Sequence, residues 1–117
     1  KDFSLLDKEL QEVIVDMMYN IGKDFLKATY KVFRSHINNY IKEIKKPNKD
    51  QQKIINLAGL IHTEISERSP AYLSQQEGSG RAKNNIKKLE KFLENIITST
   101  KTNESYSMKS VYKHLFV

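Results

Sequence analysis

The sequence predicts an all-α protein, a single compact bundle of about five to seven helices around a buried central helix. Apolar residues recur at three- and four-residue spacings through most of the chain, which is the periodicity of a helix face. No alternation typical of strands extends beyond a few residues. A length of 117 residues suits one core, so we expect residues 1–117 to form a single helical domain.

The composition is that of a soluble, basic, globular chain. Apolar residues make up 38% and the mean hydropathy is -0.61, too apolar for a disordered tail and too polar for a membrane span. The formal net charge of +6 favours an anionic partner, such as nucleic acid, anionic lipid or a cell-wall polymer. Because cysteine is absent, disulfides and thiolate chemistry are excluded. The first residues lack a signal-peptide layout, and without a starting Met we expect a trimmed or processed chain.

The first predicted helix spans roughly Leu5–Ile21. Ser4 followed by Asp7 gives a capping-box pattern, and Gly22 suits the C′ position. One face carries apolar residues at helical spacing, namely Leu6, Leu10, Val13, Ile14, Met17 and Ile21. Three further apolar residues lie off that face: Val15, Met18 and Tyr19. We therefore expect this helix to be the central and most buried one.

Two more helices are predicted before residue 68. The second begins at Asp24 and ends at the turn around Pro47, and a break near Ser35 is left open. Its apolar stripe consists of Phe25, Tyr30, Phe33, Ile37, Ile41 and Ile44. The third has Asn48 as its candidate N-cap, and Gly59 either lowers its propensity or permits a close helix crossing. Its inward positions are Ile54, Leu57, Ala58, Ile61 and Ile65.

The remaining sequence predicts a short helix and a longer one. Ser69 and Pro70 suit the N-cap and first residue of a helix that continues to about Gln76. After a glycine turn, a fifth helix from about Arg81 to Ile97 is expected to bury Ile86, Leu89, Leu93 and Ile96. The polar TSTKTNES segment then separates it from an additional C-terminal helix within 98–117, expected either to cap the core or to cover an apolar groove.

The sequence predicts neither a metal nor a cofactor. The three histidines, His36, His62 and His114, are far apart and form no zinc-binding pattern. The GSGR segment has no lysine and no preceding strand, so it does not predict a phosphate-binding loop. Carboxylates along the first helix and at the end of the third are interpreted as solvated charges, because paired-carboxylate catalysis needs an acid in an apolar pocket.

Two stretches carry a more specific signal when they are taken in order. EVIVDMMYNIG, Glu12–Gly22, is an apolar helix with a glycine stop, and SPAYLSQQEGSGRAKNNIKKL, Ser69–Leu89, is a short helix, a tight turn and an Arg-Ala-Lys helix start. Together they resemble the C-terminal lobe of the phage-type lysozymes, the muramidases of the T-even phage family. Elsewhere the chain resembles that lobe only in its helical pattern.

The resemblance implies a lysozyme C-lobe-like fold and a peptidoglycan-directed function at the bacterial cell wall. By resemblance, Asn20 matches a polar residue that faces the substrate cleft, and Arg81 matches an arginine that points at the catalytic glutamate of the other lobe. Tyr72, Gln75 and Gln76 match the cleft edge. Amides, hydroxyls and an aromatic face on short rigid elements suit neutral sugar partners. The alternative for Tyr72 is a packing residue.

The chain also departs from the family. No glutamate is followed by aspartate and threonine at the family's spacing, the short helix lacks tryptophan, and a charged turn is inserted at Lys45–Lys53. We therefore assign no catalytic residue here and expect the catalytic glutamate to come from an upstream or separate lobe. The alternative is a non-catalytic basic helical module that binds a protein or nucleic acid. Nucleic acid is the less favoured partner, because the aromatic residues of YKVFRSHINNYIKEIKK share the stripe expected in the core.

Overall fold

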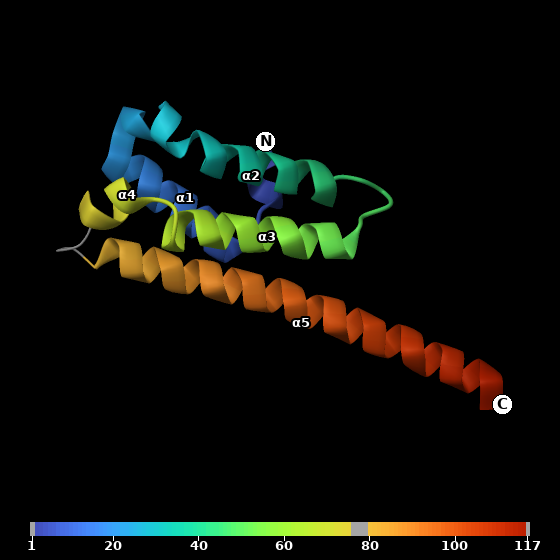
Figure 1. Ribbon diagram of the computed structural model, residues 1–117. Coiled ribbons are helices and arrows are strands. Elements are labelled where there is room, and N and C mark those ends of the chain that lie inside the picture. The colour runs from blue at the N-terminus through green and yellow to red at the C-terminus, as the bar shows by residue number, and fades with distance from the viewer. Residues whose placement is uncertain (1, 76–79, 117) are drawn as a thin grey trace.

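Five α-helices and no strand make up the described part of the chain, which confirms the predicted all-α bundle (Figure 1). The computed structural model describes residues 2–75 and 80–116, and for residues 71, 75 and 100–116 it describes the backbone alone. The helices are α1 (Lys8–Ile21), α2 (Lys31–Ile44), α3 (Gln51–Ser66), α4 (Pro70–Gln75) and α5 (Arg81–Phe116). Short 3-10 turns precede α1 and α2, namely η1 (Asp2–Leu5), η2 (Gly22–Leu26) and η3 (Ala28–Tyr30).

The bundle is built around α3, which runs between α2 and α5, while α1 packs against α5 (Figure 1). All the inward residues predicted for α3 are buried. On α1, the predicted core face is largely buried, but Val15, Met18 and Tyr19 are 55%, 50% and 85% exposed. The expectation that α1 is the most enclosed helix is therefore wrong. Its second apolar group faces solvent.

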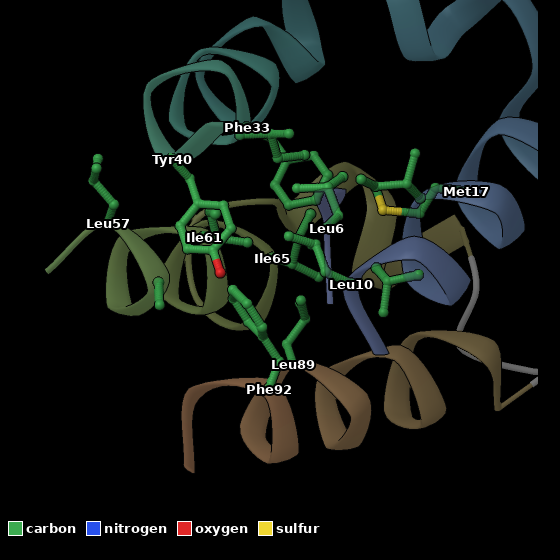
Figure 2. Packing of buried hydrophobic residues seen from close by; sticks show 14 of the residues in the cluster. Leu6, Leu10, Met17, Phe33, Tyr40, Leu57, Ile61, Ile65, Leu89 and Phe92 are labelled. Carbon is green, nitrogen blue, oxygen red and sulfur yellow. The ribbon is translucent and has the colours of Figure 1, made fainter. Parts of the chain in front are cut away.

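Apolar side chains from α1, α2, α3 and α5 meet in one core (Figure 2). Tyr40 and Phe92 belong to it, with ring centroids 5.4 Å apart in an edge-to-face arrangement, although the sequence predicted neither as buried. The buried stripe of α2 passes through Tyr40 and Glu43, whereas Ile41 and Ile44 are only partly buried. Because Glu43 is charged, the hydropathy pattern does not indicate that its side of the helix is the buried one.

Glu43 is buried because its charge is fully partnered. Its Oε2 accepts a hydrogen bond from the Asp50 backbone N–H at 3.3 Å, and its Oε1 lies 3.2 Å from Lys46 Nζ and 3.3 Å from Lys53 Nζ. The Asp50 N–H, followed by the two lysines, lowers the pKa of the Glu43 carboxyl below its usual value. The pair of lysines and the amide thus link the end of α2 to the start of α3.

Several predicted boundaries shift by a few residues. The N-cap of α1 is Asp7 in place of Ser4, and the Asp7 carboxylate accepts a hydrogen bond from Tyr40 Oη at 2.9 Å. The N-cap of α3 is Asp50, which accepts from the Lys53 N–H at 3.2 Å, in place of Asn48. Short polar side chains several residues apart compete for such positions, and the fold selects one.

The break before α2 falls at Lys27, whose ψ of 172° is extended, and not near Ser35. Gly22 ends α1 with a φ of 68° and a ψ of -137°, a conformation open to glycine but different from the left-handed helical one of the predicted C′ cap. A Cβ on Gly59 would meet nothing within 4 Å, so this glycine lowers helix propensity and does not serve a close crossing.

α5 continues without interruption to Phe116, so the predicted TSTKTNES linker is helical and the additional helix within 98–117 is its continuation. No glycine or proline lies between Arg81 and Val117, so nothing in the sequence stops the helix. The C-terminal part of α5 extends beyond the bundle, and the molecule measures 60 × 26 × 21 Å (Figure 1).

Candidate functional site

A groove of about 590 Å³ lies between α1 and the first turns of α5, and we call it the α1–α5 groove. It is lined by Phe3, Gln11, Glu12, Val15, Asp16, Tyr19, Asn20, Arg81 and Lys88. Two of the predicted site residues, Asn20 from the end of α1 and Arg81 from the start of α5, therefore lie on one concave surface.

Helix geometry explains why α1 supplies most of this lining. Glu12, Asp16 and Asn20 are spaced by four residues, and Val15 and Tyr19 lie beside them, so all five share the helix face opposite the core. The groove is thus the solvent-facing side of an amphipathic helix. The long α5 forms its other wall.

Arg81 is placed by the turn that precedes it. Gly80 has a φ of 73°, a conformation that L side chains rarely adopt, and its carbonyl accepts the Asn84 N–H at 3.1 Å. α5 begins directly after Gly80, at Arg81. The backbone conformation of Gly80 therefore sets the position at which the Arg81 side chain leaves the backbone.

Asp16 is the residue around which the other polar groups of the groove gather. Its Oδ1 accepts a hydrogen bond from Asn20 Nδ2 at 3.1 Å and lies 3.9 Å from Arg81 Nη1, while its Oδ2 accepts from Asn85 Nδ2 at 2.9 Å. Asn20 also donates to the Asp16 backbone carbonyl at 2.8 Å. The hydrogen bonds from the two amides hold this carboxylate and Asn20 in place, whereas Arg81 lies within ion-pair distance of Asp16 but beyond hydrogen-bond distance.

Asp16 and Asn85 were not predicted as site residues. The signal that could have found them is spacing, because Asp16 precedes Asn20 by one helical turn and Asn85 follows Arg81 by one turn. Both therefore lie on the helix faces that already carried a predicted residue. Asp16 had been interpreted as a solvated charge, but its side chain is only 32% exposed.

Tyr72 does not reach the groove, which corrects the prediction that it lines a ligand cleft. It is 1% exposed, packs edge-to-face on Tyr30 at 6.4 Å, and accepts a hydrogen bond from Asn85 Nδ2 at 2.7 Å. Burial raises the pKa of its hydroxyl above the usual value. The ring is thus enclosed between Tyr30, at the end of η3, and the Asn85 side chain of α5. Tyr72 is therefore a packing residue, as the alternative interpretation of the sequence had it.

The two predicted glutamines cannot be placed in the same way. Gln76 lies outside the described residues, and so does the side chain of Gln75, the last residue of α4.

Tyr19 is the more exposed of the two aromatic residues that line the groove, the other being Phe3, and it takes the position predicted for Tyr72. Its side chain is 85% exposed beside Asn20 and Asp16. The sequence prediction treats Tyr19 as one of three apolar residues off the core face that indicate a central, buried helix. Its position off the main apolar face of α1 was the signal that it faces outward.

A second charged pair, Glu12 and Lys88, also lines the groove. Glu12 Oε2 lies 3.1 Å from Lys88 Nζ, which joins α1 to α5. Glu12 and Asp16 thus each lie beside a cation of α5. Among the described residues, no three metal-ligating side chains gather at one point.

Within residues 2–75 and 80–116, no helix combines the length and apolar character of a transmembrane span. Comparison with protein-family models, with curated proteins and with solved structures gave no match for this chain.

Proposed function

We propose that this chain binds bacterial peptidoglycan or its fragments in the α1–α5 groove. The observation that carries the proposal is that Asn20 and Arg81, two of the five residues that the lysozyme resemblance implies at a substrate cleft, line one groove with the exposed ring of Tyr19. No catalytic residue of this chain is assigned, and hydrolysis would require a carboxylic acid from outside it.

The chemistry of the groove suits an amino sugar that carries a carboxylate. The face of the Tyr19 ring offers an apolar platform for the C–H face of a pyranose. The Nδ2 of Asn20 and the Nε2 of Gln11 each already donate two hydrogen bonds within the chain, so these amides offer their carbonyl oxygens to the hydroxyl groups of a ligand. Arg81 supplies a forked cation for the lactyl or peptide carboxylate of a muramyl unit.

Titration with soluble disaccharide-peptide fragments of peptidoglycan, followed by amide chemical shifts, tests the proposal. We expect shifts at Tyr19, Asn20 and Arg81, and about tenfold weaker binding for Tyr19→Ala, the usual loss for one aromatic contact. Met18→Ala is the matched control, because Met18 is 50% exposed on the same helix and does not line the groove.

A neutral chitooligosaccharide separates sugar recognition from carboxylate recognition. Arg81→Gln should weaken binding of the muramyl fragment and leave binding of the neutral oligosaccharide nearly unchanged. If neither ligand shifts the groove amides, while binding to nucleic acid or an acidic protein falls steeply with salt, the chain is instead the basic interaction module. Lysis of purified cell walls by this chain alone would show that it contains a catalytic acid.

A further inference from the structure

A second site lies on α2, away from the α1–α5 groove, and begins with an apolar pocket. This pocket has a volume of about 210 Å³ and lies between η1, α1, η2 and α2. Its apolar lining consists of Phe3, Leu6, Ile14, Phe25, Ile37 and Ile41. Apolar cavities of about 150 Å³ with similar linings hold a benzene molecule, so this one suits an alkyl tail of about six to eight carbons.

A polar groove of about 290 Å³ adjoins the pocket along the same helix. Its lining consists of Lys31, Arg34, Ser35, Asn38, Asn39 and Lys42. Arg34 and Asn38 line the pocket as well, so these two residues form the boundary between an apolar and a basic compartment. Neither lining includes a carboxylate, and within the described residues no carboxylate pairs with Lys31 or Lys42.

Arg34 is held in place before any ligand arrives. Its Nη1 donates to the carbonyls of Phe25 at 2.6 Å and Lys27 at 2.9 Å, at the end of η2. The structure shows no hydrogen-bond partner among the described residues for its Nε and Nη2. A guanidinium fixed on one side with free donors on the other is pre-organised for an anion, which lowers the entropy cost of binding.

We infer that the pocket and the adjoining groove together bind one medium-chain amphiphile with an anionic head, such as a carboxylate, as a free monomer. The tail occupies the apolar pocket and the head lies beside Arg34, where Lys31 and Lys42 supply further positive charge. This site is independent of the proposed glycan groove, apart from Phe3, which lines both.

A series of straight-chain carboxylates below their micelle concentrations tests the tail. From butyrate to octanoate, affinity should rise by about fourfold for each methylene group and then level off when the pocket is full. Amide shifts should centre on Arg34, Ile37 and Ile41. Binding that does not depend on chain length would overturn the inference, and so would binding of phosphatidylglycerol vesicles without any response to octanoate.

Octanamide and a charge-reversed variant test the head. Octanamide has a tail of similar length and a neutral head, so it should bind about tenfold more weakly than octanoate. The double substitution Lys31→Glu/Lys42→Glu should lower the affinity for octanoate by about tenfold and leave the affinity for octanamide unchanged. Lys83→Glu/Lys87→Glu on the exposed side of α5 is the matched control with the same change in net charge. Equal loss in both double variants, or equal affinity for the two ligands, would contradict recognition of the head.

Discussion

The amide nitrogen of Asn85, a buried side chain of α5, lies 2.9 Å from Asp16 Oδ2 on the groove face of α1. The same nitrogen donates to Tyr72 Oη at 2.7 Å. Its two hydrogens therefore serve one groove residue and one core residue. The Asn85 side chain thus connects the groove residue Asp16 to Tyr72 of α4.

Asn85→Ala should lower the free energy of unfolding by about 2 kcal/mol. The substitution leaves the enclosed Tyr72 hydroxyl without this donor and removes a partner of Asp16. Asn84→Ala, one residue earlier and exposed, is the control and should change stability by less than about 0.5 kcal/mol. Urea denaturation of both variants measures the difference, and equal values would mean that the Asn85 network contributes nothing specific.

Tyr72→Phe should reduce stability but leave glycan affinity intact. The ring remains in the core, and loss of the hydroxyl leaves one Asn85 hydrogen without its acceptor at a cost of about 1 kcal/mol. Because Tyr72 does not line the groove, the affinity for a muramyl fragment should stay within about twofold of the parent. A large loss of affinity in a folded Tyr72→Phe variant would restore Tyr72 as a ligand-contacting residue.

The sequence predicted the helical class and most of the core because apolar periodicity records which face of each helix is buried. It predicted Tyr72 in the groove, where the structure has Tyr19. The two side chains are chemically identical, so only the position of each on its helix relative to its neighbours decides which one is exposed. Periodicity also missed Tyr40, because the buried stripe of α2 includes Glu43, and a carboxylate counts as an outward residue in any hydropathy pattern.

The Asp16–Asn85 contact joins residues far apart in the sequence, and no local rule predicts such a pair.

The sequence pattern does not decide which residue caps α3, for a related reason. Several short polar residues can cap a helix, and Asp50 was selected over Asn48 by the contact of its N–H with Glu43, which lies on another helix.

Glu43→Gln should destabilise the protein at neutral pH, and the difference should disappear in acid. The pKa of Glu43 is lowered in the fold, so its charged form contributes stability above the usual value of 4.5, and this is lost as pH falls through the folded pKa. Thermal unfolding of both proteins from pH 7 to pH 3 measures the effect. Glu67→Gln, at the exposed end of α3, is the control for removal of one charge at neutral pH and should change stability little. A difference that stayed constant across this range would show that the charge of Glu43 does not stabilise the fold.

Gly22→Ala and Gly59→Ala should have opposite effects on stability, although the chemical change is the same. Gly22 has a φ of 68° and a ψ of -137°, where an L residue is strained by about 1–3 kcal/mol, and the added methyl group meets nothing within 4 Å, so strain alone decides the outcome. Gly59 lies inside α3 with equally open surroundings, and alanine there gains about 1 kcal/mol of helix propensity. Chemical denaturation of the two variants beside the parent protein checks the signs. A shift in the same direction for both would show that backbone conformation is not what distinguishes these glycines.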